Sequence, residues 1–96
     1  MRHKNNVTLG QALEMMVKEL KIKGKLDETR IQDGWERIMG KPIAKYTSSI
    51  SLKGGKLYIK VENAPLKQEL SYDREKIRDL FNQELGSDVI REVVIF

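Results

Sequence analysis

The stretch ISLKGGKLYI, residues 50–59, decides the fold of this chain. A Gly-Gly pair between two runs of alternating apolar and polar residues favours a two-residue turn with positive φ angles. Such a turn fixes the strand register, and the apolar pairs share one face while the other face is polar. We therefore predict an antiparallel hairpin that is covered on one side only. The predicted pairs are Ile50 with Ile59, Leu52 with Leu57, and Ser48 with Val61.

Two helices are predicted before the hairpin. The first runs from Thr8 to Leu20 or Ile22, because Thr8 and Gln11 form a capping box and apolar residues follow at helical spacing. Gly24 is expected to end it as the residue after the C-cap. The second helix runs from Glu28 to Met39, with Trp35 on its apolar face.

A third helix and a strand are predicted after the hairpin. The helix runs from Asn63 or Ala64 to Leu85, with a bend in the polar segment 71–74. The strand covers 89–96 and carries apolar residues on both faces, which is typical of a strand inside a sheet or covered on both sides. The order α-α-β-β-α-β indicates an α+β domain over residues 8–96. Its helices pack mainly on one face of a three-stranded sheet. Residues 1–7 form a basic N-terminus that we expect to be mobile.

Composition and charge limit the classes of protein to which the chain can belong. Its 96 residues suit one domain. It has no cysteines, which excludes disulfides and thiolate metal sites and favours a reducing compartment. Residues 1–60 hold 13 basic and 6 acidic residues, whereas residues 61–96 hold 5 and 8. The basic part suggests a polyanion as partner. No apolar run reaches the roughly 20 residues that span a bilayer, so we expect a cytoplasmic protein with no membrane contact.

The sequence offers no catalytic apparatus. His3 is the only histidine, so no Ser-His-Asp or Cys-His set can be built. Gly54-Gly55 joins two strands and precedes no helix, unlike a phosphate-binding loop. No metal-ligand spacing occurs. We therefore expect a protein that is not an enzyme, needs no cofactor or metal, and acts by binding.

The polar face of the hairpin is the best candidate binding site. Lysines neutralise phosphates, and an aromatic ring on a sheet can stack on a base. Basic residues at the end of the second helix and in the loop after it are predicted to extend this surface. A structural alternative stays open, since lysines also protect edge strands from aggregation. The predicted nucleic-acid-binding residues are Lys53, Lys56, Tyr58 and Lys60, with Arg37, Lys41 and Lys45.

A longer pattern of residues resembles a bacterial domain-of-unknown-function family, the one that includes DciA, the replicative-helicase operator or loader. The resemblance covers roughly residues 8–96. The residues that carry it are Trp35, Ile38, Gly40, Ile43-Ala44, Thr47, Leu57, Ile59, Val61, Glu69-Leu70, Leu80, Leu85-Gly86, Val89-Ile90, Val93 and Ile95-Phe96.

The resemblance implies a KH-like fold, binding to single-stranded or duplex DNA, and contact with a DnaB-type helicase without catalysis. The chain lacks a G-x-x-G loop between helices, so the usual KH mechanism of RNA binding is not supported. Two alternatives remain open at this stage. One is a protein–protein interaction module, for instance a homodimer formed through the C-terminal strand. The other is an RNA-binding KH-like protein without a loader role.

Overall fold

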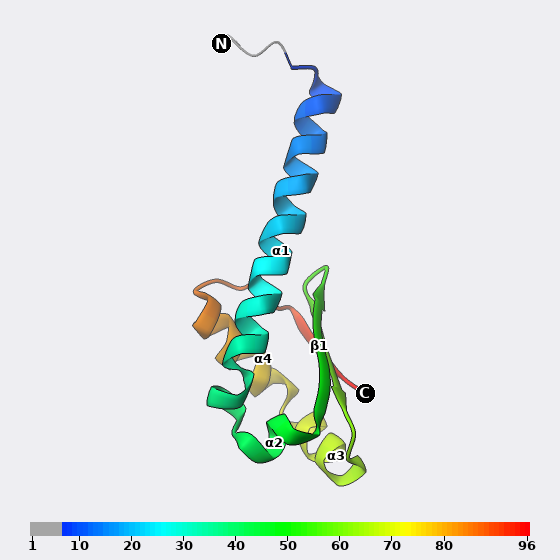
Figure 1. The fold of residues 1–96 in the computed structure, drawn as a ribbon, viewed down its shortest axis with the longest axis vertical. Coiled ribbons are helices and arrows are strands. Elements are labelled where there is room, and N and C mark those ends of the chain that lie inside the picture. Colours follow the sequence, from blue (N-terminus) through cyan, green and yellow to red (C-terminus); the bar gives the residue numbers. More distant parts are fainter. Residues whose placement is uncertain (1–6) are drawn as a thin grey trace.

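The computed structural model describes residues 7–96, and one long helix dominates it (Figure 1). Helix α1 (Leu9–Met39) has 31 residues, and its predicted capping box at Thr8 is confirmed. The prediction of two separate helices was wrong, because the helix continues through Gly24. A glycine inside a helix costs only about 1 kcal/mol. Ion pairs within the helix follow directly, from Lys23 to Asp27 at 2.7 Å and from Lys25 to Glu28 at 2.9 Å.

The remaining elements form a small body at the C-terminal end of α1. They are α2 (Lys41–Tyr46), β1 (Thr47–Lys53), β2 (Lys56–Val61), α3 (Ala64–Tyr72), α4 (Arg74–Leu85) and β3 (Glu92–Ile95). The sheet order is β1-β2-β3, with β1 antiparallel and β3 parallel to β2. The predicted α+β class and three-stranded sheet are confirmed. The segment predicted as a loop after Met39 is the short helix α2, and the predicted third helix breaks at Asp73, within the segment where a bend was expected.

The register of the hairpin is confirmed near the turn and wrong at its far end. Ile50 pairs with Ile59 and Leu52 with Leu57, as predicted from the Gly-Gly turn. Val61, however, lies opposite Thr47 and not Ser48, because a bulge intervenes. The Thr47 hydroxyl explains the shift: it accepts a 3.0 Å hydrogen bond from the Trp35 indole and donates one of 2.8 Å to the Ile43 carbonyl.

The hydrophobic core lies between the sheet and the helices. Buried residues alternate along β2, where Leu57, Ile59 and Val61 face the helices and the residues between them face outward. From the helices, the core receives Ile31, Trp35, Leu70, Ile77 and Phe81. The helices thus pack on one face, as predicted.

The two edges of the sheet have different surroundings. At the β1 edge, the Leu52 N–H donates to the buried Glu28 carboxylate at 2.9 Å, and the Gln32 amide donates to the Ile50 carbonyl at 2.9 Å. Helix α1 therefore closes this edge. The expectation that the C-terminal strand is interior was wrong: β3 is the other edge, and its Val93 faces the core while residue 92 is exposed. It is shorter than predicted because residues 89–91 lead into it as a loop.

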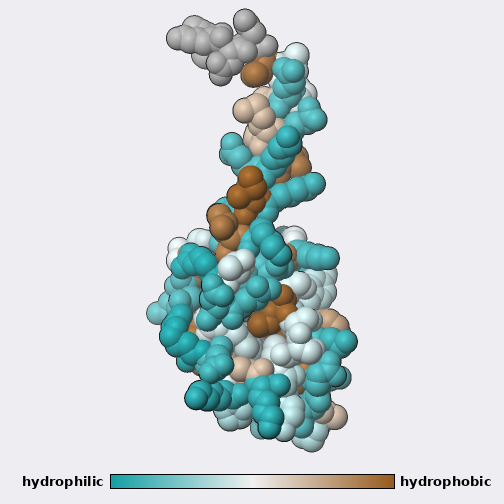
Figure 2. All heavy atoms as spheres, viewed as in Figure 1, coloured by the Kyte–Doolittle hydropathy of each residue, from teal (hydrophilic) through white to brown (hydrophobic). Residues whose placement is uncertain are grey.

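The N-terminal half of α1 extends beyond the body and makes the molecule long, 58 × 21 × 19 Å (Figure 2). Apart from the half-buried Ala12 and Gly24, every residue from Val7 to Leu26 is exposed. We call residues 9–24 the arm. The predicted basic N-terminus, with His3, lies outside the described residues except for Val7.

Candidate nucleic-acid interface

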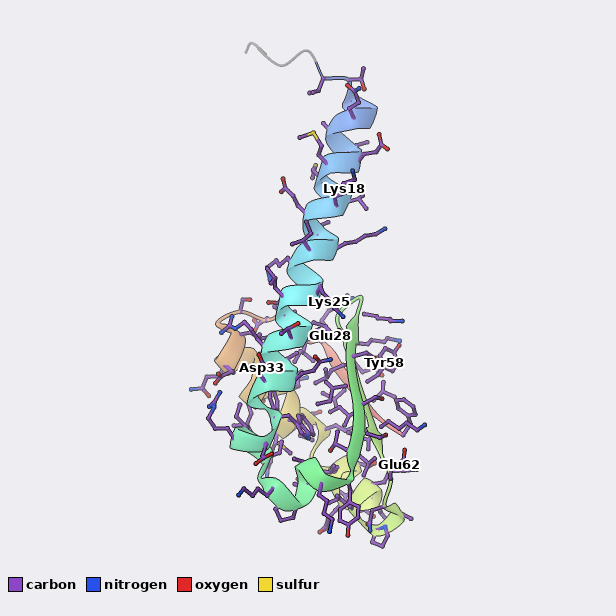
Figure 3. The ribbon with its side chains drawn as sticks, viewed as in Figure 1. Lys18, Lys25, Glu28, Asp33, Tyr58 and Glu62 are labelled. Atoms are coloured by element: carbon purple, nitrogen blue, oxygen red, sulfur yellow. The ribbon has the colours of Figure 1, made fainter. Side chains whose placement is uncertain are left out.

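The open face of the sheet brings four of the predicted residues together. Lys56, Tyr58 and Lys60 alternate with the buried residues of β2 and point away from the helices, and Lys53 pairs with Lys56 across the turn. Figure 3 places Tyr58 on the side of the hairpin away from α1. Ser51 lies beside Tyr58 on β1. This part of the predicted site is one continuous surface.

Carboxylates partly balance the lysines of this face. Lys56 lies 3.8 Å from Glu92, and Lys60 lies 3.8 Å from Glu62. All four side chains are about half exposed, so these pairs are weak and are open to exchange with a phosphate. Within residues 7–96, Lys53 has no carboxylate at ion-pair distance. The open face is therefore only moderately basic in the free protein.

The other predicted residues lie on helices α1 and α2 and not on the hairpin strands. Arg37 lies on α1 and forms a 2.6 Å ion pair with Glu84 of α4, within the helical layer. Lys41 and Lys45 lie on α2, which leads into the start of β1, while Lys53 lies at its end. A strand of this length separates them from Lys53 by about 20 Å. The end of α2 lies beside the other end of the hairpin, near Lys60, because the Tyr46 carbonyl accepts from the Glu62 N–H at 2.8 Å. Lys45 instead lies 5.6 Å from the centre of the Tyr46 ring.

The structure reveals a second basic site that the sequence reasoning missed. A groove of about 370 Å³ runs between the start of α4 and strand β3. Three arginines line it, Arg74 and Arg78 from α4 and Arg91 from the loop before β3, together with Glu75 and Glu92. Asp79 lies 3.0 Å from Arg78 and raises the pKa of its guanidinium further. The i, i+4 spacing of Arg74 and Arg78 was a visible signal, since it places both on one helix face.

Arg91 is held at the hairpin turn. Its guanidinium donates to the Gly54 carbonyl at 2.5 Å, and its backbone N–H donates to the Gly55 carbonyl at 2.7 Å. A Cβ atom at Gly55, whose φ is +83°, would lie 2.5 Å from the Arg91 side chain. The Gly-Gly turn therefore does more than reverse the chain, because it also sets the position of a basic side chain in the groove.

The outer edge of β3 forms one wall of the groove. Phe96 exchanges hydrogen bonds with β2, donating to Ile59 at 2.9 Å and accepting from Val61 at 2.7 Å. Because hydrogen bonding alternates along a parallel strand, the backbone groups of Val93 and Ile95 point away from β2. These donors and acceptors lie beside the arginines. They provide polar contacts for an extended ligand.

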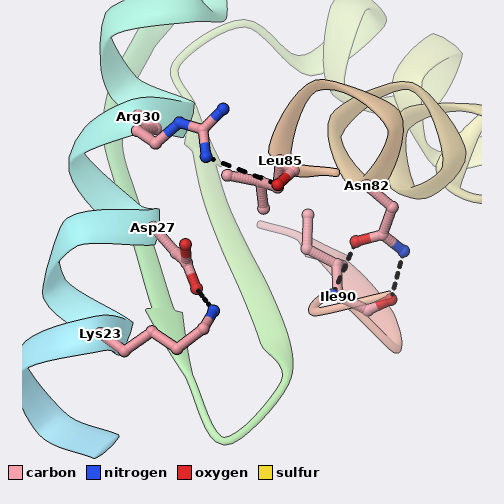
Figure 4. A network of polar contacts seen from close by, with 6 residues as sticks. All are labelled: Lys23, Asp27, Arg30, Asn82, Leu85 and Ile90. Atoms are coloured by element: carbon pink, nitrogen blue, oxygen red, sulfur yellow. Dashed lines mark hydrogen bonds and ion pairs between the residues drawn. The ribbon is translucent and has the colours of Figure 1, made fainter. Parts of the chain in front are cut away.

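Asn82 fixes the chain where it enters β3 (Figure 4). This buried side chain donates to the Ile90 carbonyl and accepts from the Ile90 N–H, both at 2.8 Å. Nearby, Arg30 of α1 donates to the Glu84 carbonyl at 2.7 Å and ties α1 to the end of α4. These hydrogen bonds hold the loop that leads into β3 against α4, and the end of α4 against α1.

Within residues 7–96, no group of three or more His, Cys, Asp or Glu side chains is placed to hold a metal ion. No helix of this part of the chain is long and apolar enough to cross a membrane.

The family model described as Dna[CI] antecedent, DciA, matches residues 8–95. This chain belongs to the DciA family. The resemblance inferred from the Trp35–Thr47 pattern is thus confirmed. Membership associates the chain with bacterial DNA replication and with helicase loading. Neither the curated proteins nor the solved structures gave a significant match.

The DciA pattern of this chain is largely a pattern of core contacts. Trp35 is buried, stacks on Phe81 with ring centroids 5.2 Å apart, and donates to Thr47. Gly40 has a φ of +96° and connects α1 to α2. These residues connect α1 to β1, α4 and α2. They explain how the DciA fold is specified, but they do not identify the binding residues, which lie on the surface.

Proposed function

We propose that this chain is a non-enzymatic accessory protein of a DnaB-type replicative helicase and that it binds single-stranded DNA along β3. Its membership of the DciA family carries the helicase part of this proposal. The arrangement of basic side chains on both sides of β3 supports the DNA part. The protein would act in the cytoplasm, without a cofactor.

The open face and the groove adjoin each other at β3. The register places Glu92 beside Lys56 and Val94 beside Tyr58, and both β3 residues also line the groove. A DNA strand that follows β3 would have lysines on one side and arginines on the other. Its bases would contact the Tyr58 ring and the exposed backbone edge, while its phosphates would pair with the basic groups.

Binding of a fluorescent single-stranded oligonucleotide across a salt series tests the DNA part. We expect Lys56→Glu with Lys60→Glu, and Arg74→Glu with Arg78→Glu, each to weaken binding more than tenfold at low salt. Each pair should also flatten the logarithmic salt slope by about 1.4, since two phosphate contacts are lost at about 0.7 each. The matched control is Lys18→Glu with Lys21→Glu, the same change of charge on the distant arm.

The results of this series separate the competing interpretations. If only the arginine pair matters, the groove alone is the site and the prediction for the hairpin lysines is wrong. If neither pair matters more than the arm control, β3 is not the site. Competition with RNA and duplex DNA of the same sequence ranks the alternatives, and preference for RNA would contradict the DNA proposal.

Retention of the cognate replicative helicase on the immobilised chain tests the helicase part. We expect retention with and without single-stranded DNA, and loss of it would remove the loader role. The homodimer suggested for the C-terminal strand is disfavoured by the groove. Pairing two β3 edges would bring three arginines and two glutamates of each copy together, a net positive charge on both sides that like-charge repulsion opposes.

A further inference from the structure

Exposed apolar side chains lie along the arm (Figure 2), and those on one face of the helix form a stripe with nothing against it. At 100° per residue the stripe lies on the same helix face as Ile31 and Ile38, which pack in the body. The face that α1 buries against the sheet thus continues outward for four more turns without a cover. Its members are 48–77% exposed: Leu9, Leu13, Met16, Val17 and Leu20.

An arm of this kind has little stability as an isolated helix. Helices in proteins owe most of their stability to the packing of an apolar face, and each glycine in an exposed helix costs about 1 kcal/mol. Gly10 and Gly24 both lie in the arm, and Cβ atoms there would meet nothing of the body. The arm therefore combines an exposed apolar face with two helix-weakening residues, a combination that favours a covered state.

We propose that a second copy of the chain covers this stripe, with the two arms antiparallel. The spacing of the stripe is self-complementary. Leu9, Leu13, Met16 and Leu20 follow the alternating four-and-three spacing of a coiled-coil seam. When one arm is reversed, Leu9 falls opposite Leu20 of the second copy and Leu13 opposite Met16, so that all four positions are matched at once.

Charge favours the reversed arrangement over the parallel one. In a parallel pair, Lys23, which takes the next seam position after Leu20, would lie beside Lys23 of the second copy. In the antiparallel pair, the two Lys23 side chains lie toward opposite ends of the paired arms, about 25 Å apart along the axis. The two bodies then lie at opposite ends of the paired arms.

A cleft at the base of the arm extends the proposed contact. It has a volume of about 570 Å³ and lies where α1 leaves the body, between Val17, Leu20 and Gly24 on one side and Leu52 at the hairpin on the other. Leu9 of the second copy, opposite Leu20, would lie at its mouth. Five apolar side chains from each copy bury on the order of 1,000 Å² in total, near the lower limit of specific interfaces. We therefore expect a weak, concentration-dependent dimer.

Met16 and Met15 provide a matched pair of variants. They are adjacent, of the same residue type and almost equally exposed, at 57% and 55%. Met16 lies in the stripe, whereas Met15 lies toward the opposite side of the helix. Sedimentation equilibrium should show that Met16→Glu raises the dimer dissociation constant at least about 100-fold, because symmetry places the new charge in the interface twice. Met15→Glu should change it less than about threefold.

Cysteine pairing tests the orientation, since the chain has no cysteine of its own. Under mild oxidation, a mixture of Leu9→Cys and Leu20→Cys chains should form the mixed disulfide dimer. Each variant alone should form none, because identical positions then lie about 16 Å apart along the helix axis, beyond disulfide reach. Linkage within each variant alone would show a parallel pair and overturn the arrangement.

Two further outcomes would overturn the proposal altogether. One is a chain that stays monomeric at the highest attainable concentration. The other is equal dimerisation of the Met16→Glu and Met15→Glu variants. Binding of the monomer to vesicles of anionic lipid, lost in Met16→Glu, would assign the stripe to a membrane surface instead. Because the arm lies outside the body, Trp35 fluorescence should remain native in all of these variants.

Discussion

Replacing Asn82 by leucine should destabilise the protein by about 3 kcal/mol. Asn82 satisfies both backbone groups of Ile90, which is 1% exposed, through two hydrogen bonds of 2.8 Å. Leucine has a similar size and cannot replace either bond. Leaving a buried donor or acceptor unpaired costs about 1–3 kcal/mol each, and the added apolar burial returns about 1 kcal/mol. The expected loss is a large part of the free energy of unfolding of a small domain.

Urea unfolding followed by Trp35 fluorescence measures this loss directly. Trp35 is the only tryptophan and stacks on Phe81, the neighbour of Asn82. The control is Gln83→Leu, the same kind of replacement at the next position, which is exposed, and it should change the free energy of unfolding by less than about 0.5 kcal/mol. If the two variants agree within about 1 kcal/mol, the Asn82–Ile90 bonds do not hold the entry to β3 as argued.

Two further substitutions test the edges of the sheet. The pKa of Glu28 is lowered by the Leu52 N–H and then by Lys25, so the native protein should be more stable than Glu28→Gln above about pH 4.5. This advantage should vanish as the pH falls through the lowered pKa, as urea midpoints across pH will show. Gly55→Ala should cost about 2 kcal/mol and weaken DNA binding by displacing Arg91, because positive φ and close contact coincide there. Gly54→Ala, with φ +58° and open space around it, should cost about 1 kcal/mol and leave binding unchanged.

The sequence predicted the parts of the fold that depend on residues close together in the chain. The Gly-Gly turn fixed the pairing of Ile50 with Ile59, and the Thr8 capping box marked the start of α1. The predicted helix end at Gly24 was wrong, because a glycine after an apolar stripe is typical of a helix end but does not require one. Whether a helix stops at such a glycine depends on the residues around it, and here the ion pairs at Lys23 and Lys25 are compatible with one more helical stretch. Each residue of an exposed helix interior changes the stability of the helix too little for the sequence to show whether the helix continues.

The bulge at the start of β1 depended on a contact between distant segments. Thr47 is drawn toward the core by Trp35, twelve residues earlier in the chain, and by Ile43. No property of the segment 47–49 itself signals this. In the same way, the loss of residues 89–91 from the predicted strand is explained by Asn82, whose side chain binds Ile90 in place of a strand partner.

The candidate site was predicted only where it lies on a single hairpin. Lys53, Lys56, Tyr58 and Lys60 came together because the turn determines their neighbours. The groove combines segments 74–78 and 91–95, which the sheet topology alone brings side by side. Both lie in the last third of the chain, where acidic residues outnumber basic ones. The charge distribution along the sequence therefore did not predict a basic site there.

The two edges of the sheet differ, and the difference indicates which edge serves as the interface. An open edge attracts strands of other chains, and proteins usually cover or charge it. Here Glu28 and Gln32 occupy the backbone groups of β1, whereas the groups of Val93 and Ile95 stay open beside three arginines. Positive charge at an open edge discourages pairing with a second copy of the same edge and favours an extended anionic ligand. Single-stranded DNA is such a ligand, which is why the β3 edge, more than the hairpin lysines, is where the proposed binding should be tested first.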